Sequence, residues 1–296
     1  MLQERLLARF PAAALATAAA LSVASSAGAR EHAVEQVQFP SADGHTQLVG
    51  YLFIPDRESG RAPAIVLMHG RSGAYAKGAD GDYSAHTLRR RDETWARFWR
   101  ARGYEVLIVD SFGPRGYPAG FAAGTHDERP ASVDEVAVRP FDAYGALAYL
   151  RTRPEVAPDR VGLMGWSNGA SATLASLATD GVASAGHSST HDGFRAALAF
   201  YPGCGLGGAF DAGYRPYGPV RIFIGTADEE VSLDACRTLA AKNARVGGGI
   251  TLTIYPGATH DFDDPSNHRQ DTDANVTAKA DATDKATAFF DGILRP

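Results

Sequence analysis

The sequence predicts an α/β fold with a mostly parallel central sheet, helices on both faces of the sheet, and an antiparallel hairpin near the N-terminus. Three observations support this. Short apolar runs typical of buried strands alternate with helix-compatible stretches. One such run, 160–164, leads through a Gly-x-Ser-x-Gly turn into a small-residue helix at 170–178. Two later apolar runs each end in a short loop that carries an acid or a base.

The elements can be justified in chain order. Residues 35–39 and 47–53 alternate with a period of two around Asp43-Gly44, which predicts the hairpin. Residues 87–102 are amphipathic, so the basic run 89–91 is expected on a solvated helix face. The remaining expected strands are 64–68, 104–110, 160–164, 195–201, 219–225 and 250–255, and the remaining expected helices are 133–150, 170–178, one beginning at Cys236, and 274–294.

The first 29 residues read as a secretory signal peptide. Basic residues precede the alanine- and leucine-rich stretch 10–23, and Ala27-Gly28-Ala29 matches a cleavage site. A membrane anchor is disfavoured by Pro11 and by the small-residue ending. We therefore expect a periplasmic or secreted protein whose residues 30–296 form one domain. No repeat or linker divides them.

Ser167 is the expected nucleophile. It lies in Gly165-Trp166-Ser167-Asn168-Gly169, between a strand and a helix, and a sharp turn of this kind exposes the hydroxyl and leaves no room for side chains at the two glycines. A serine needs a base that an acid orients, and in this arrangement the acid and then the base follow later in the chain. Asp228 and His260 satisfy that order after strands 219–225 and 250–255. Glu229 and Glu230 adjoin Asp228 and are alternative acids.

The loop after strand 64–68 predicts an oxyanion hole. It reads His69-Gly70-Arg71, and the backbone N–H of Arg71, with that of Asn168, can approach the carbonyl oxygen of a substrate. His69 could be taken for a second base, but a hydrogen-bonded support is the favoured role.

With these motifs in place, the chain resembles the dienelactone hydrolase family of α/β-hydrolases, over about 37–293. Besides the segments above, the resemblance rests on the segments 109–116, 200–204, 225–228 and 255–262. Family members with dienelactone activity carry a cysteine nucleophile and a glutamate in the first loop, whereas this chain has Ser167 and no carboxylate at 69–71. The resemblance therefore implies a serine hydrolase of carboxylic esters or lactones. The alternatives are an exported serine peptidase or acyltransferase, and a non-catalytic binding protein of the same fold.

Four further expectations concern single residues and composition. Arg115, in the loop after strand 104–110, either faces the pocket and pairs with a substrate carboxylate or pins the loop. Cys204 and Cys236 are expected to form a disulfide in an oxidising compartment, with two buried thiols as the alternative.

The pair His187 and His191 lacks further ligands, so no metal and no other cofactor is expected. A net charge of −5 argues against nucleic-acid binding, and no stretch of the mature chain could span a bilayer, so the expected partner is a small ester.

Overall fold

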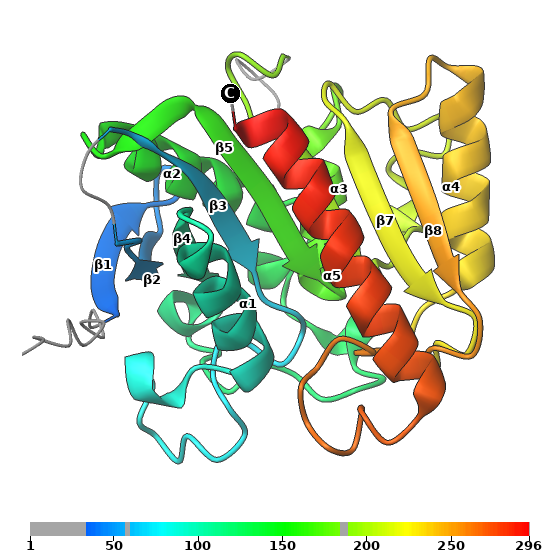
Figure 1. Cartoon of the computed structure of the whole chain (residues 1–296), viewed down its shortest axis with the longest axis horizontal. Coiled ribbons are helices and arrows are strands. Elements are labelled where there is room, and N and C mark those ends of the chain that lie inside the picture. The colour runs from blue at the N-terminus through cyan, green and yellow to red at the C-terminus, as the bar shows by residue number, and fades with distance from the viewer. Residues whose placement is uncertain (1–33, 57–59, 184–188, 296) are drawn as a thin grey trace, which may run out of the picture. The chain divides into compact units, whose positions relative to one another are not determined.

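The computed structural model describes residues 34–56, 60–183 and 189–295, so the predicted signal segment lies outside the described residues. In this part of the chain, eight strands form one sheet in the order β1-β2-β4-β3-β5-β6-β7-β8 (Figure 1). The strands are β1 (Glu35–Pro40), β2 (Gln47–Phe53), β3 (Ala62–Met68), β4 (Glu105–Asp110), β5 (Val156–Trp166), β6 (Ala197–Phe200), β7 (Val220–Gly225) and β8 (Ile250–Tyr255).

The sheet is parallel from β4 to β8 and antiparallel at its N-terminal edge. β1 pairs with β2 across the predicted hairpin, and β2 then pairs antiparallel with β4. β3 and β4 are buried at every position, as expected for strands covered on both faces. The predicted α/β-hydrolase architecture is confirmed.

Helices cover both faces of the sheet (Figure 1). α1 (Arg90–Ala101) and α5 (Asp273–Leu294) lie on one face, and α2 (Arg139–Thr152) packs beside α3 (Asn168–Leu177) on the other, while α4 (Leu233–Arg245) packs against β8. α3 is buried at every position, and its small residues permit this close packing. Short 3₁₀ turns occupy Ala85–Thr87, Gly113–Arg115, His126–Glu128, Ala131–Val133 and Leu206–Gly208. Among the described helices, none is long and apolar enough to cross a bilayer.

Among the differences from the sequence-based expectations, three have a clear physical reason or consequence. The second helix starts at Arg139 rather than 133, because Asp134 caps a preceding turn and Pro140 fits only the first helical turn. The helix after β7 starts at Leu233 rather than Cys236, because the Ser232 hydroxyl caps it. Arg91 is buried rather than solvated.

The carboxyl ends of the parallel strands gather the predicted functional residues. His69 and Arg71 follow β3, Ser167 follows β5, Asp228 follows β7 and His260 follows β8. Because these strands run in the same direction, their ends meet at one edge of the sheet, where ligand sites of open α/β sheets form.

Candidate active site

Ser167 occupies a strained turn between β5 and α3. Its φ of 51° and ψ of −119° lie in a region that side chains other than glycine rarely adopt. The flanking glycines make this turn possible. A Cβ at Gly169 would lie 2.1 Å from the carbonyl oxygen of Met68, and one at Gly165 would lie 2.3 Å from that of Gly169. The turn therefore requires both glycines.

The imidazole of His260 contacts the carboxylate of Asp228. Nδ1 of His260 lies 2.9 Å from Oδ2 and 3.0 Å from Oδ1 of Asp228. Two backbone N–H groups, those of Glu230 and Val231, also donate to Oδ1 and fix the orientation of this carboxylate. His260 and Ser167 line the same small pocket. The structure thus brings Asp228, His260 and Ser167, the expected acid, base and nucleophile, to one place.

The two neighbouring glutamates have other partners. Glu229 accepts hydrogen bonds from the backbone N–H of His260 (2.9 Å) and from Arg269 (2.8 Å), so it holds the base loop rather than the imidazole. Glu230 lies on the opposite side of the imidazole, 3.7 Å from Nε2. Of the three candidate acids, Asp228 is therefore the one that meets Nδ1.

Charges around His260 favour its protonated form. Burial alone would lower the pKa of His260, but the hydrogen bond to Asp228 and the negative charges of Asp261, Asp228 and Glu230 outweigh burial and raise it. The site is therefore suited to stabilising the imidazolium that forms when a serine transfers its proton.

The loop after β3 is held from two sides. Ser111 N–H donates to Nε2 of His69 (3.2 Å), while Nδ1 contacts the carbonyl of Gly70 (2.7 Å). Burial and the charge of Arg139 lower the pKa of His69 well below its usual range. A neutral, fully bonded imidazole fits a supporting role, not that of a second base.

The expected oxyanion groups lie in the same cavity as Ser167. Arg71 and Asn168 line a cavity of about 550 Å³ together with Ser167. Within the described chain, neither backbone N–H donates a hydrogen bond to another residue, so both are available to a ligand. This is the arrangement that an oxyanion hole requires.

Arg139 ties both oxyanion segments together, and the sequence analysis missed it. Its guanidinium donates to the side-chain oxygen of Asn168 (2.5 Å) and to the backbone carbonyl of His69 (2.8 Å). Complete burial lowers the pKa of Arg139 to about 10. Glu135 accepts from the amide of Asn168 (2.7 Å) on the other side. Only their position near the start of a predicted helix could have drawn attention to these residues.

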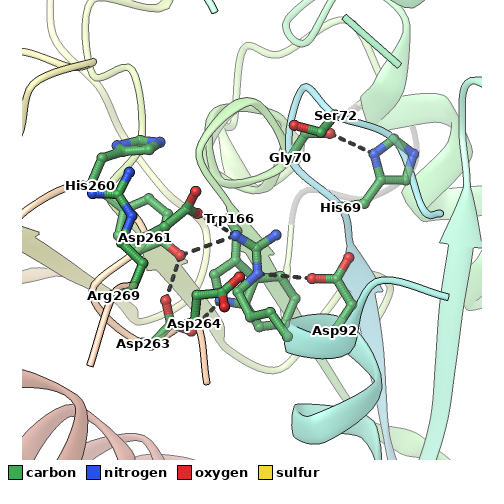
Figure 2. Close-up of polar contacts among 12 residues, drawn as sticks. His69, Gly70, Ser72, Asp92, Trp166, His260, Asp261, Asp263, Asp264 and Arg269 are labelled. Atoms are coloured by element: carbon green, nitrogen blue, oxygen red, sulfur yellow. Dashed lines mark hydrogen bonds and ion pairs between the residues drawn. The ribbon is translucent and has the colours of Figure 1, made fainter. Parts of the chain in front are cut away.

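A buried polar network lies next to His260 (Figure 2). Arg91 donates to Asp92 (2.9 Å) and Asp261 (2.5 Å), and it lies 5.0 Å from the ring centre of Trp166. Asp263 is 1% exposed and accepts from Trp95, Trp166 and Tyr201. Although burial raises the pKa of Asp261, the charges of Arg91 and His260 hold it at about 2. The Asp-x-Asp pattern after the base was the available signal.

Of the two roles expected for Arg115, its contacts support the second, which is to pin the loop after β4. Its guanidinium donates to both carboxylate oxygens of buried Asp142 (2.8 Å each), to Asp43 (3.0 Å) and to the carbonyl of Ser111 (2.8 Å). These bonds pin the loop after β4 to α2 and to the N-terminal hairpin, so Arg115 is not available to a substrate carboxylate.

The two cysteines form a disulfide. Cys204 and Cys236 are joined with a Cα–Cα distance of 4.9 Å, and the bridge connects the loop after β6 to α4. Cys204 also lines the larger cavity. The described residues contain no cluster of three metal-binding side chains, and His187 of the histidine pair lies outside them.

Comparison with known proteins identifies the family. The model of the dienelactone hydrolase family matches residues 48–294. The chain belongs to the dienelactone hydrolase family. It is 27% identical to YtaP of Bacillus subtilis (strain 168) over 146 residues, a match that covers 47% of each chain, so the aligned part spans about half the length of that relative.

Solved structures of low sequence identity share the fold of this family member. A dienelactone hydrolase-like promiscuous phosphotriesterase from metagenomic libraries has a TM-score of 0.64 at 20% identity, with 88% of this chain and 98% of that chain covered. Thermogutta terrifontis esterase 2, phosphorylated by paraoxon, has a TM-score of 0.60 at 19% identity, with coverages of 89% and 96%.

Proposed function

We propose that this member of the dienelactone hydrolase family is a serine hydrolase that cleaves carboxylic esters through an acyl-enzyme on Ser167. The observation that carries the proposal is that Ser167, in its strained turn, shares a pocket with His260, whose Nδ1 contacts Asp228. The structural relatives include an esterase and a phosphotriesterase, both of which act on esters.

Each catalytic group has a defined task in this proposal. Ser167 Oγ attacks the acyl carbon while Nε2 of His260 takes its proton, and the N–H groups of Arg71 and Asn168 stabilise the oxyanion. The acyl–oxygen bond of the substrate then breaks, and the alcohol leaves with the proton from His260. A water molecule attacks the acyl-enzyme, giving its proton to His260, and the acid is released as Ser167 regains a proton.

Replacement of the nucleophile tests the proposal. Ser167→Ala is expected to lower kcat on a short-chain p-nitrophenyl ester by about 10⁴- to 10⁶-fold, because triad residues act as a unit. Asp228→Asn should cost far more than Glu229→Gln. A fluorophosphonate probe should label the wild type but not Ser167→Ala. Hydrolysis of peptide p-nitroanilides in preference to esters would favour a peptidase instead, and activity that survives Ser167→Ala would refute the assignment.

We also propose that the chain acts outside the cytosol, after removal of the first 29 residues. The disulfide between Cys204 and Cys236 supports this location, since disulfides persist mainly in oxidising compartments. Recovery of the protein in the cytosolic fraction with its N-terminus intact would contradict the proposal.

A further inference from the structure

The larger cavity beside Ser167 combines apolar and charged lining. Leu206, Val231 and Ala235 contribute apolar groups, which suit the carbon skeleton of an ester. Several ionisable side chains also line the cavity. Their pairing determines which charge remains available to a ligand.

Most of these ionisable side chains already have partners. Each carboxylate on the cavity wall accepts at least one hydrogen bond from a basic or amide side chain, and the remaining cations are engaged with them. The pairs are Arg71 with Glu230 (2.9 and 2.5 Å), Glu229 with Arg269 (2.8 Å), and Glu135 with both His126 (2.9 Å) and Asn168 (2.7 Å).

Arg129 is the exception among them. Within residues 34–56, 60–183 and 189–295, no acceptor makes a hydrogen bond or ion pair with its guanidinium, and its Nε is shielded from solvent without a partner. The guanidinium carbon lies 6.0 Å from the centre of the Phe121 ring. Burial lowers the pKa of Arg129, so its charge is incompletely compensated by the protein.

Glu135 is not a hydrogen-bond partner of Arg129. Its charge acts favourably on Arg129, but its two oxygens accept from Asn168 and His126. Partial burial leaves the Arg129 cation poorly solvated, and an anion that entered the cavity would compensate its charge. A guanidinium presents its donors as a fork that matches the oxygens of a carboxylate or phosphate.

We propose that Arg129 binds a negatively charged oxygen group on the substrate, so that the ester this protein cleaves carries an anion at the end of an apolar chain. The inference rests on the proposed esterase function and specifies its substrate class. The anion lies in the same cavity as Ser167, and the apolar lining accommodates the chain between the two.

A matched pair of esters tests this inference. p-Nitrophenyl valerate and mono-p-nitrophenyl glutarate have acyl chains of equal length and differ in the terminal carboxylate. The wild type should prefer the glutarate hemi-ester. Arg129→Gln should lower kcat/KM on the hemi-ester by about 10- to 100-fold, mainly through KM, and change the valerate value by less than about threefold. Arg129→Lys should restore part of the preference.

Two controls separate substrate binding from structural effects. Arg90→Gln removes an exposed arginine of α1 that does not line the cavity, and it should leave both substrates unaffected. An equal loss on both esters in Arg129→Gln would show that Arg129 only balances Glu135, and would overturn the inference. Unchanged selectivity would overturn it as well.

A binding measurement keeps the test independent of turnover. Ser167→Ala should bind the glutarate hemi-ester at least about tenfold more tightly than the double variant Ser167→Ala/Arg129→Gln, measured by titration calorimetry. If the wild type hydrolyses neither ester, the proposed function fails, and calorimetry still decides the role of Arg129. Equal affinities would refute the anion site even in an active esterase.

Discussion

His260 lies between two carboxylates that act on different nitrogens. Asp228 contacts Nδ1, while Glu230 lies 3.7 Å from Nε2, the nitrogen that accepts the proton of Ser167 in the proposed mechanism. Arg71 holds Glu230 in this position through two hydrogen bonds. The side chain of the oxyanion loop thus fixes a negative charge next to the base, which couples the two halves of the site electrostatically.

The pH profile should report that charge. A base acts in its neutral form, so kcat/KM is expected to rise with pH as His260 loses its proton. Because Glu230 helps to raise the pKa of His260, Glu230→Gln should lower that pKa and move the acidic limb to lower pH. Release of Arg71 in the variant acts in the same direction. The measurement is kcat/KM on p-nitrophenyl acetate from pH 5 to 9.

A surface glutamate provides the control for this shift. Glu128 is exposed and lines neither cavity, so Glu128→Gln should leave the profile unchanged. An acidic limb that stays in place or moves to higher pH in Glu230→Gln would mean that the charge of Glu230 does not raise the pKa of His260. The electrostatic account of His260 would then be wrong.

At this scale, the sequence predicted the residues that belong to short motifs. Ser167, Asp228 and His260 follow strands in a recognisable order, and the structure brings them together as that order predicts. Arg129 and Arg139 carry no such signal. Their roles depend on which acceptors lie near them in space. For Arg139 these acceptors come from distant segments, and for Arg129 the described part of the chain supplies none.

At the scale of elements, the turn between β5 and α3 depends on its glycines. Gly169→Ala should destabilise the protein by about 1–3 kcal/mol or prevent folding, because its Cβ would overlap the carbonyl of Met68. Gly292→Ala, in α5, has open space around its Cβ and should be neutral or stabilising by up to about 1 kcal/mol. Urea unfolding monitored by circular dichroism measures both. A stable Gly169→Ala variant would contradict the steric argument.

The boundaries of elements were predictable where one physical signal dominates. Buried apolar runs located the strands, and the period-two pattern located the hairpin. The predicted start of α2 was too early because the apolar residues of 133–138 keep a helical spacing, while Asp134 and Pro140 decide the local geometry. The basic run 89–91 shows a related limit, since Arg91 is buried against Asp261, which lies 170 residues later in the chain.

For the whole molecule, the disulfide ties the loop after β6 to α4 and encloses the segment that carries Asp228. Cys204 and Cys236 are 32 positions apart, and the chain between them contains β7 and Asp228. Cross-linking a loop of this length is expected to stabilise the fold by about 3–4 kcal/mol, chiefly by restricting the unfolded chain. The stability of the acid loop is therefore linked to the redox state of a bridge that also borders the larger cavity.

Reduction of the bridge should lower the melting temperature and weaken the acid loop first. Activity lost on mild heating should precede global unfolding, because the segment that carries Asp228 opens more readily without its cross-link. Ser167 and His260 lie outside the bridged segment, so a fluorophosphonate probe should still label the reduced protein at low temperature. A Cys204→Ala/Cys236→Ala variant should behave like the reduced form and be insensitive to reductant, which separates loss of the bridge from other effects of the reagent. Two titratable thiols in denatured, unreduced protein isolated from the periplasm would contradict both the bridge and the linkage argued from it.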